Sequence, residues 1–132
     1  MDIIFVQIAG IVVAAVSFGI AFFQILLLLG LPLAEYSWGG KYKGVLPKKM
    51  RIISLPTSLI LMFFGFVFLI HTKEIYIGFN LPTYIFVWIF TILMAINTLG
   101  NLASKSKKER IVMSPLTIVS FLSCVIILIL GK

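Results

Sequence analysis

The chain has 132 residues, of which 61% are hydrophobic and only 11% are charged, and its mean hydropathy is +1.19. So few charged residues cannot cover a water-soluble core of this size, which excludes an ordinary soluble domain. The net charge is +7, but the basic residues lie in short stretches between apolar runs and not on a folded soluble surface. This distribution argues against binding to nucleic acid.

Four uncharged runs fill the chain, at residues 3–34, 52–72, 75–104 and 111–131. Each is long enough for a helix to cross a bilayer, which takes about 20 apolar residues. We therefore predict an all-α membrane protein, a bundle of four transmembrane helices in one domain over residues 1–132, with no room for a separate soluble domain. The first run is too long for a signal peptide, so we expect it to be retained as a helix. The expected spans are about 4–31, 55–72, 82–103 and 114–130.

Prolines suggest where the spans begin and end. We expect the first span to stop at Pro32 and the second to start near Pro56, with Ser54 as its cap, because proline suits the first helical turn. The same signal places the start of the third span at Pro82 and that of the fourth at Pro115.

The basic residues are distributed unequally between the two sides of the predicted bundle. Only Lys73 and Lys132 fall on the side of the termini. The other nine lie between spans one and two or between spans three and four: Lys41, Lys43, Lys48, Lys49, Arg51, Lys105, Lys107, Lys108 and Arg110. Because basic loops stay in the cytoplasm, we predict that both termini lie outside. We also expect the basic loops to contact anionic lipid headgroups.

The two halves of the chain share a short pattern. Arg51-Ile-Ile-Ser-Leu-Pro56 and Arg110-Ile-Val-Met-Ser-Pro115 have arginine, isoleucine and proline at one constant offset, each after a basic loop and before a span. This pattern is consistent with two hairpins related as a parallel repeat about an axis along the membrane normal. Arginine followed by proline is also a common way to begin a span at the cytoplasmic face, so duplication and coincidence are both open.

Small and polar residues recur along the first span at alternating steps of three and four, which places them on one helix face. They are Gln7, Gly10, Ala14, Ser17, Ala21, Gln24, Leu28, Leu31 and Glu35. One interpretation is a seam where other helices pack closely and the glutamines form hydrogen bonds across the interface. The alternative is that Gln24 lines a small cavity that Glu35 closes at its inner end.

The third span carries Asn97 and Asn101 one turn apart near its cytoplasmic end. Amides are costly in hydrocarbon unless their hydrogen bonds are satisfied, so we expect both to face the bundle near Glu35 and Trp38. They either tie helix ends together or form a polar ligand pocket. The candidate ligand-binding residues are therefore Glu35, Trp38, Asn97, Asn101 and Gln24.

The sequence offers no set of residues for catalysis, for a metal or for a cofactor. Cys124 and His71 are the only cysteine and the only histidine, so neither has a partner of its kind. Glu109 lies among basic residues, where we expect local charge pairing. We predict no catalytic residue, no metal site and no cofactor.

Two strings carry a resemblance to known proteins. Glu35-Tyr-Ser-Trp-Gly-Gly40, followed by Val45-Leu-Pro47, resembles the first loop of small, uncharacterised four-helix membrane proteins of bacteria. The segment from Asn101 to Arg110, followed by Pro115, resembles their second cytoplasmic loop. The resemblance implies a multi-pass protein of the bacterial plasma membrane, the inner membrane, and it brings no activity and no catalytic residue.

These observations favour a non-enzymatic membrane protein that binds or transports a small or lipid-like molecule. Because four spans enclose little volume, a transport path would require a homodimer. One alternative is an accessory subunit whose small-residue seams pack against another membrane protein. The other is a lipid-modifying enzyme, which would need a general acid or base beside an electrophile site.

Overall fold

The structure of the chain is a computed structural model that describes residues 2–73, 78 and 82–130. Its long elements are α1 (Asp2–Leu28), α2 (Lys48–His71), α3 (Thr83–Leu102) and α4 (Lys107–Leu130). Two 3-10 turns, η1 (Ala34–Tyr36) and η2 (Trp38–Gly40), lie between α1 and α2. Each long helix has the length and apolar composition needed to cross a membrane. These features confirm the predicted all-helical fold with four helices that can span a bilayer.

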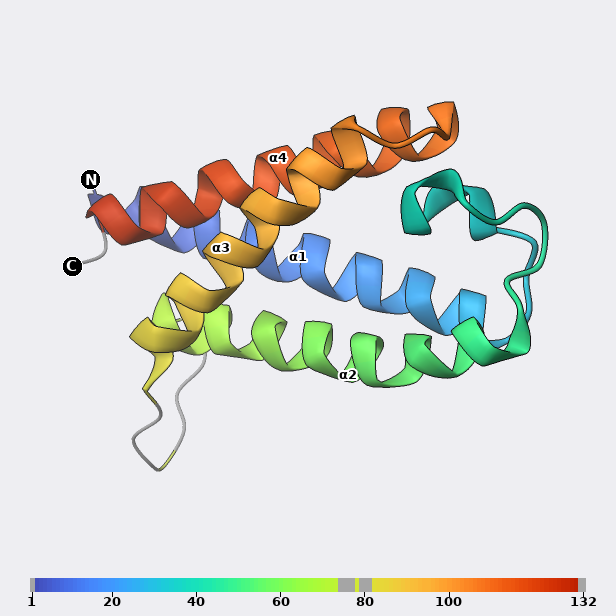
Figure 1. Cartoon of the computed structure of the whole chain (residues 1–132). Coiled ribbons are helices and arrows are strands. Elements are labelled where there is room, and N and C mark those ends of the chain that lie inside the picture. The colour runs from blue at the N-terminus through green and yellow to red at the C-terminus, as the bar shows by residue number, and fades with distance from the viewer. Residues whose placement is uncertain (1, 74–77, 79–81, 131–132) are drawn as a thin grey trace.

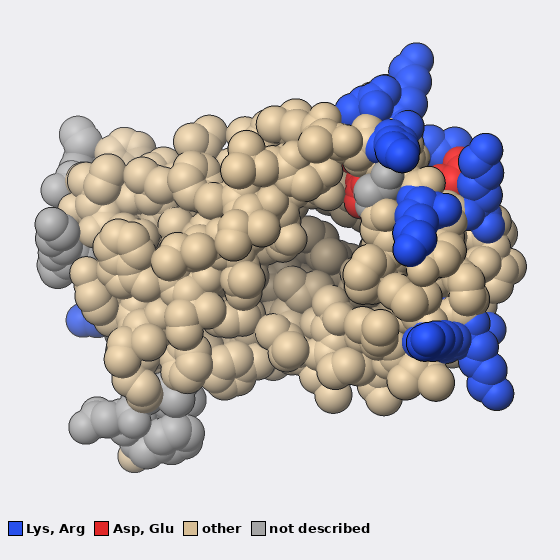
Figure 2. Space-filling view, in the orientation of Figure 1, with Lys and Arg blue, Asp and Glu red and all other residues tan. Residues whose placement is uncertain are grey.

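The helix α1 lies between α2 and α4, while α3 crosses from the end of α2 to the start of α4 (Figure 1). As a result, α2 and α3 diverge along their length. Nine of the basic residues gather at one end of the molecule, formed by residues 34–51 and 103–110, which we call the basic end (Figure 2). The helix α1 begins and α4 finishes at the opposite end (Figure 1).

The main apolar core lies in the half of the bundle away from the basic end. It contains buried residues from the early part of α1, the late part of α2, the early part of α3 and the late part of α4. The ring of Phe90 on α3 lies 4.9 Å from that of Phe64 and 5.2 Å from that of Phe68, both on α2. Because this aromatic cluster joins α2 to α3 near only one end, the two helices separate toward the basic end.

The predicted seam on α1 is confirmed between Gly10 and Ala21. Gly10, Ala14, Ser17 and Ala21 are all buried, and the Ser17 hydroxyl donates a hydrogen bond to the carbonyl of Leu61 on α2 at 2.5 Å. Small side chains on this face let α2 and α4 approach the backbone of α1 closely.

The helices α2 and α4 begin earlier than their prolines suggest. They start at Lys48 and Lys107, so Pro56 and Pro115 lie inside the helices, at the same offset from each start. Ser54 is buried within α2 and is not its cap, so the prediction from the prolines is wrong here. The physical reason is that the apolar run marks the hydrocarbon layer, whereas the lysine-rich turns before it consist of good helix formers and extend the helix beyond that layer.

The end of α1 also differs from the prediction. The helix finishes at Leu28, and Gly30 follows with a φ of +92°, so Pro32 is not what stops it. The backbone N–H groups of Gly30 and Leu31 donate to carbonyls of the last turn at 3.1 and 3.2 Å. This pattern is a Schellman motif, which requires the left-handed conformation that glycine adopts without steric cost.

An arginine in the first turn of α2 and another in the first turn of α4 reach back to the preceding segment. Arg51 on α2 donates from Nε and Nη2 to the carbonyl of Leu28 at the end of α1, at 3.2 and 3.0 Å. Arg110 on α4 donates from Nη1 to the carbonyl of Ser104, just after α3, at 2.6 Å. Each of these bonds satisfies a carbonyl at or beyond a helix C-terminus that has no partner within the helix.

Candidate ligand-binding site

A cavity of about 470 Å³ lies toward the basic end, where α2 and α3 diverge. Its volume is within the range of about 300–1,000 Å³ that is usual for small-molecule sites. The space-filling view shows a hollow on the face between these two helices (Figure 2). The polar part of the lining comes from all four helices and the 3-10 turns: Gln24, Tyr36, Ser37, Thr57, Asn97, Glu109 and Thr117. The apolar part includes Ile20, Phe23, Leu61, Met94, Ile96 and Met113.

The most unusual residue of the lining is Glu109, in the first turn of α4. The residue is only 5% exposed, and its Oε1 has no hydrogen-bond partner among the described residues. A buried carboxylate oxygen without a partner is energetically costly, so it calls for an explanation such as a bound group. Glu109 therefore combines burial, negative charge and access to a cavity.

The neighbours of Glu109 bond elsewhere, so the local charge pairing expected from the sequence is wrong. Lys108 forms an ion pair with Glu35, its Nζ lying 3.0 Å from Oε2 of that carboxylate. Arg110 donates to the carbonyl of Ser104. No ion pair of Glu109 is found within the described part of the chain.

The local sequence around Glu109 has the form of a capping box, Ser106-x-x-Glu109, but only half of the motif forms. The N–H of Glu109 donates to the hydroxyl of Ser106 at 3.3 Å, as at a helix N-cap. In a complete capping box the glutamate side chain would accept from the N–H of Ser106. That N–H donates instead to the hydroxyl of Ser104 at 3.1 Å, which leaves the Glu109 carboxylate available to the cavity.

Three of the candidate residues from the sequence, Gln24, Trp38 and Asn97, line this cavity. They come from α1, η2 and α3, and no hydrogen bond of the Gln24 or Asn97 amide occurs among the residues that the structure describes. The other two do not line it. Glu35 is paired with Lys108, and the amide nitrogen of Asn101 donates to the hydroxyl of Thr117 at 3.3 Å.

The loop between α1 and α2 folds against the start of α4 and forms one wall of the cavity. Trp38 has a φ of +57°, an uncommon conformation for a residue with a side chain, and it is half-exposed in the lining of the cavity. Gly40 has a φ of +78°, and a Cβ there would lie 2.6 Å from the backbone nitrogen of Ser106. Together with the ion pair of Glu35, this close approach fixes the loop to α4.

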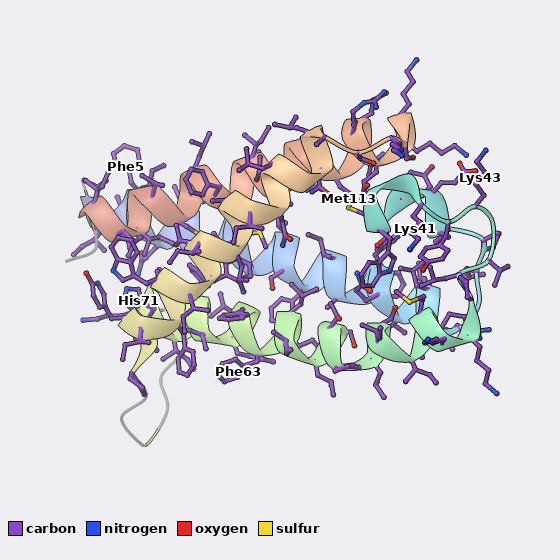
Figure 3. The ribbon with its side chains drawn as sticks, viewed as in Figure 1. Phe5, Lys41, Lys43, Phe63, His71 and Met113 are labelled. Atoms are coloured by element: carbon purple, nitrogen blue, oxygen red, sulfur yellow. The ribbon has the colours of Figure 1, made fainter. Side chains whose placement is uncertain are left out.

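The side-chain view shows how the wall and the basic end are arranged. Met113 extends from α4 toward the loop, and Lys41 and Lys43 lie on the loop itself (Figure 3). Lys41 is exposed, with its Nζ 5.6 Å from the centre of the Tyr42 ring, and it is not part of the cavity lining.

The described residues hold no group of three or more histidine, cysteine, aspartate or glutamate side chains that could bind a metal ion. The chemistry that the cavity offers is therefore a single buried carboxylate surrounded by amides, hydroxyls and apolar side chains. No protein family model matches the chain, and no similar protein is found among curated proteins or solved structures.

Proposed function

We propose that this protein binds a small amphipathic molecule in the cavity between α2 and α3, and that it is a non-enzymatic binding protein or carrier of a membrane. The observation that carries the proposal is the buried, unpartnered carboxylate of Glu109 in a cavity of ligand size. Ligand sites are typically concave and mostly apolar, with a few polar groups that fix the orientation of the ligand. A ligand that pairs with Glu109 would offset the cost of burying it.

The proposed orientation places the cavity in the cytoplasmic half of the membrane. Nine basic residues gather at the basic end, whereas Lys73 lies at the opposite end of α2. The positive-inside rule then favours the basic end in the cytoplasm and both termini outside. The resemblance of the two loops supports the plasma membrane of a bacterium as the location, and anionic headgroups are the expected neighbours of the lysines.

We also propose that the two helix pairs are a parallel repeat. Its support is the equal placement of Arg51 with Pro56 and of Arg110 with Pro115 within α2 and α4, together with the similar bonds of the two arginines to a preceding carbonyl. If the protein is a carrier, a homodimer would supply the path across the membrane that one cavity near one end does not provide.

The experiment is to purify the protein gently and to identify retained small molecules by mass spectrometry, with two glycine variants for comparison. Gly100 lines the cavity, and a Cβ there meets no atom within 4 Å; the same space surrounds Gly19 on α1, outside the lining. The Cβ of Gly100→Leu therefore meets no clash, and we expect its side chain to occupy part of the cavity; Gly19→Leu is its matched control.

We expect the wild type and Gly19→Leu to retain the same molecule and Gly100→Leu to lose it, with all three equally stable. Equal retention by the two variants would contradict binding in this cavity.

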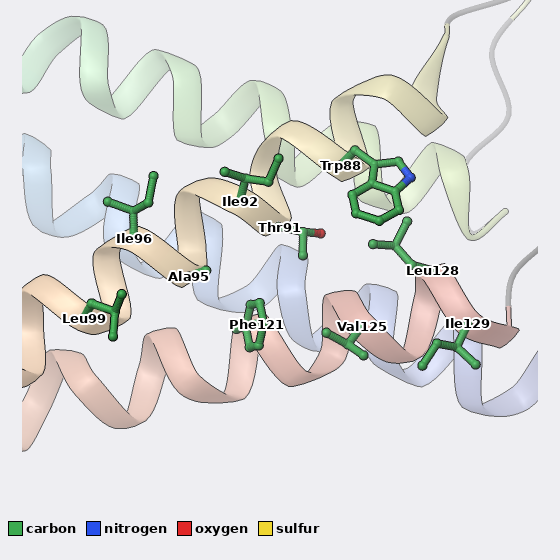
Figure 4. A pocket seen from close by; sticks show the side chains of 10 residues that line it. All are labelled: Trp88, Thr91, Ile92, Ala95, Ile96, Leu99, Phe121, Val125, Leu128 and Ile129. Carbon is green, nitrogen blue, oxygen red and sulfur yellow. The ribbon is translucent and has the colours of Figure 1, made fainter.

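A second candidate function, an accessory subunit of a membrane complex, is favoured by a groove between α3 and α4. Its lining is mostly apolar, with Trp88, Ile92 and Phe121 among the side chains, and the hydroxyl of Thr91 donates to the carbonyl of Val87 on its own helix (Figure 4). Such a groove could accept a helix of another membrane protein. In the same purification, a stoichiometric protein partner and no retained small molecule would favour this function over the first.

A further inference from the structure

We infer that the ligand of the cavity is an amphiphile whose head group is a protonated amine, and that the carboxylate of Glu109 binds the ammonium. This inference rests on the proposed function and names the chemical class of its ligand. It follows from two properties of the cavity: the charge of Glu109 and its apolar side.

Among the described residues that line the cavity, Glu109 is the only one with a charged side chain. The basic residues nearest to it in the chain, Lys108 and Arg110, are bonded to Glu35 and to a backbone carbonyl. An anionic head group would be repelled by the carboxylate, and an uncharged one would leave a buried charge without a counter-ion. A cationic head group gives Oε1 the partner that the described residues do not supply.

Other polar groups of the lining can also accept hydrogen bonds from an ammonium. The hydroxyl of Thr57 gives its proton to the carbonyl of Ile53 at 2.9 Å, which leaves oxygen lone pairs for the cavity. Gln24 and Asn97 each add an amide oxygen as well as an amide NH2. An ammonium group has three donors and no acceptor, so it can bond the carboxylate and keep donors for other oxygens of the lining. A carboxylate or phosphate head group needs hydrogen-bond donors, and the carboxylate of Glu109 supplies none.

The apolar side of the cavity fits a hydrocarbon tail. Ile20 and Phe23 on α1, Leu61 on α2 and Met94 on α3 form apolar surface beside the polar groups. Ile96, also in the lining, is 60% exposed on a helix of membrane-spanning length, so the cavity is continuous with the outer surface of the bundle. An alkyl chain can therefore extend from the cavity past Ile96 into the lipid.

The basic end does not cancel this preference. The lysines of the loop are exposed, and charges in water are screened over about 8 Å at physiological ionic strength. Contact with Glu109 takes place in a buried site, where the effective dielectric constant is lower and an ion pair is stronger. The exposed positive charges slow the approach of a cation, but the contact with Glu109 determines which head group stays bound.

The test compares three ligands with the same tail: dodecylamine, dodecanol and dodecanoate. Binding is measured by calorimetry at neutral pH to protein in nanodiscs of uncharged phosphatidylcholine. Empty nanodiscs and the cavity-filling variant Gly100→Leu correct for partition into lipid. Glu109→Gln removes the charge with little change of shape, and Glu109→Asp keeps it. Lys105→Gln reduces the charge of an exposed basic residue outside the lining.

We expect the wild type to bind dodecylamine and Gly100→Leu not to bind it. Glu109→Gln should weaken this binding at least about tenfold, as expected for the loss of a charge-assisted hydrogen bond. Glu109→Asp should keep most of the affinity. Lys105→Gln should leave it unchanged, whereas an anion held by the basic loops would bind this variant less tightly.

Two outcomes would overturn the inference in distinguishable ways. If dodecanol or dodecanoate binds as tightly as dodecylamine, and Gly100→Leu abolishes this binding, the amine is excluded while the proposed cavity function stands. If no ligand shows binding that depends on Gly100, both the inference and the proposed function fail. The ligand series on the wild type decides the matter even if Glu109→Gln does not fold.

Discussion

At the scale of single residues, the position of Glu109 sets two effects against each other. A buried polar group without a partner costs about 1–3 kcal/mol. The helix dipole favours a negative charge in the first turn of α4, which offsets about 0.3–1 kcal/mol of this cost. The unsatisfied carboxylate is therefore a net cost to the fold. Positions that break the rules of stable packing are characteristic of functional sites, which is why we assign Glu109 to binding.

Replacing Glu109 with methionine should make the ligand-free protein more stable, by about 1 kcal/mol, because it removes the unpaired buried carboxylate and keeps an unbranched side chain of similar length. The measurement is thermal unfolding of the purified protein in detergent. Glu35→Gln is the control, since it also removes one carboxylate. It breaks an ion pair whose side chains are 34% and 59% exposed, so we expect a loss of only about 0–1 kcal/mol. A lower stability for Glu109→Met would show instead that the carboxylate holds α4 in place.

Three of the candidate residues from the sequence line the cavity, whereas Glu109 was not among the candidates. Gln24, Trp38 and Asn97 could be placed at one end of the bundle, because helix periodicity and the loop positions fix their depth. Glu109 could not, because its burial depends on where α4 starts, and the adjacent Lys108 and Arg110 suggested a pairing that the fold directs elsewhere. The half-formed capping box with Ser106 was the available signal, and it would have predicted a helix starting before Pro115.

At the scale of elements, α1 organises the bundle because its small residues lie where α2 and α4 approach it. The period of three and four residues identified this face from the sequence, and the burial of Gly10, Ala14, Ser17 and Ala21 confirms it. The helix starts were harder to predict. Proline at position 56 or 115 is compatible with the first turn of a helix. It is also compatible with the interior of a helix, where other contacts can compensate for the hydrogen bond that proline removes.

Enlarging the seam on α1 should destabilise the bundle. Ala14 is only 3% exposed, so Ala14→Leu forces extra atoms into a closely packed interface, and we expect a loss of about 1–3 kcal/mol, as in overpacked cores. Ala15→Leu is the matched control, because Ala15 is exposed on the same helix and its new side chain would meet lipid. Thermal unfolding of both variants in detergent is the measurement. Equal stability of the two variants would show that this face of α1 does not pack closely against the other helices.

At the scale of the whole molecule, the aromatic core and the cavity occupy opposite halves of the bundle. Phe64, Phe68 and Phe90 hold α2 against α3 near the ends away from the basic loops, and the same two helices line the cavity where they diverge. This division keeps the cost of an open, partly polar site away from the contacts that stabilise the fold. The sequence indicated four helices, but it could not predict that α3 crosses the bundle, because crossing angles depend on the packing of side chains from different helices.

The proposed orientation can be tested with single cysteines at the two ends of the bundle. Gly44 lies in the loop of the basic end and Gly78 in the connection between α2 and α3; both are exposed, and a Cβ at either meets no atom within 4 Å. The native Cys124 is buried, so it contributes little background. In intact cells, a membrane-impermeant maleimide should label Gly78→Cys and leave Gly44→Cys unlabelled, and permeabilised cells should show labelling of both. Ready labelling of Gly44→Cys in intact cells would reverse the orientation and place the cavity on the outer side. The carboxylate of Glu109 would then face molecules that arrive from outside the cell, while the geometry of the site itself would be unchanged.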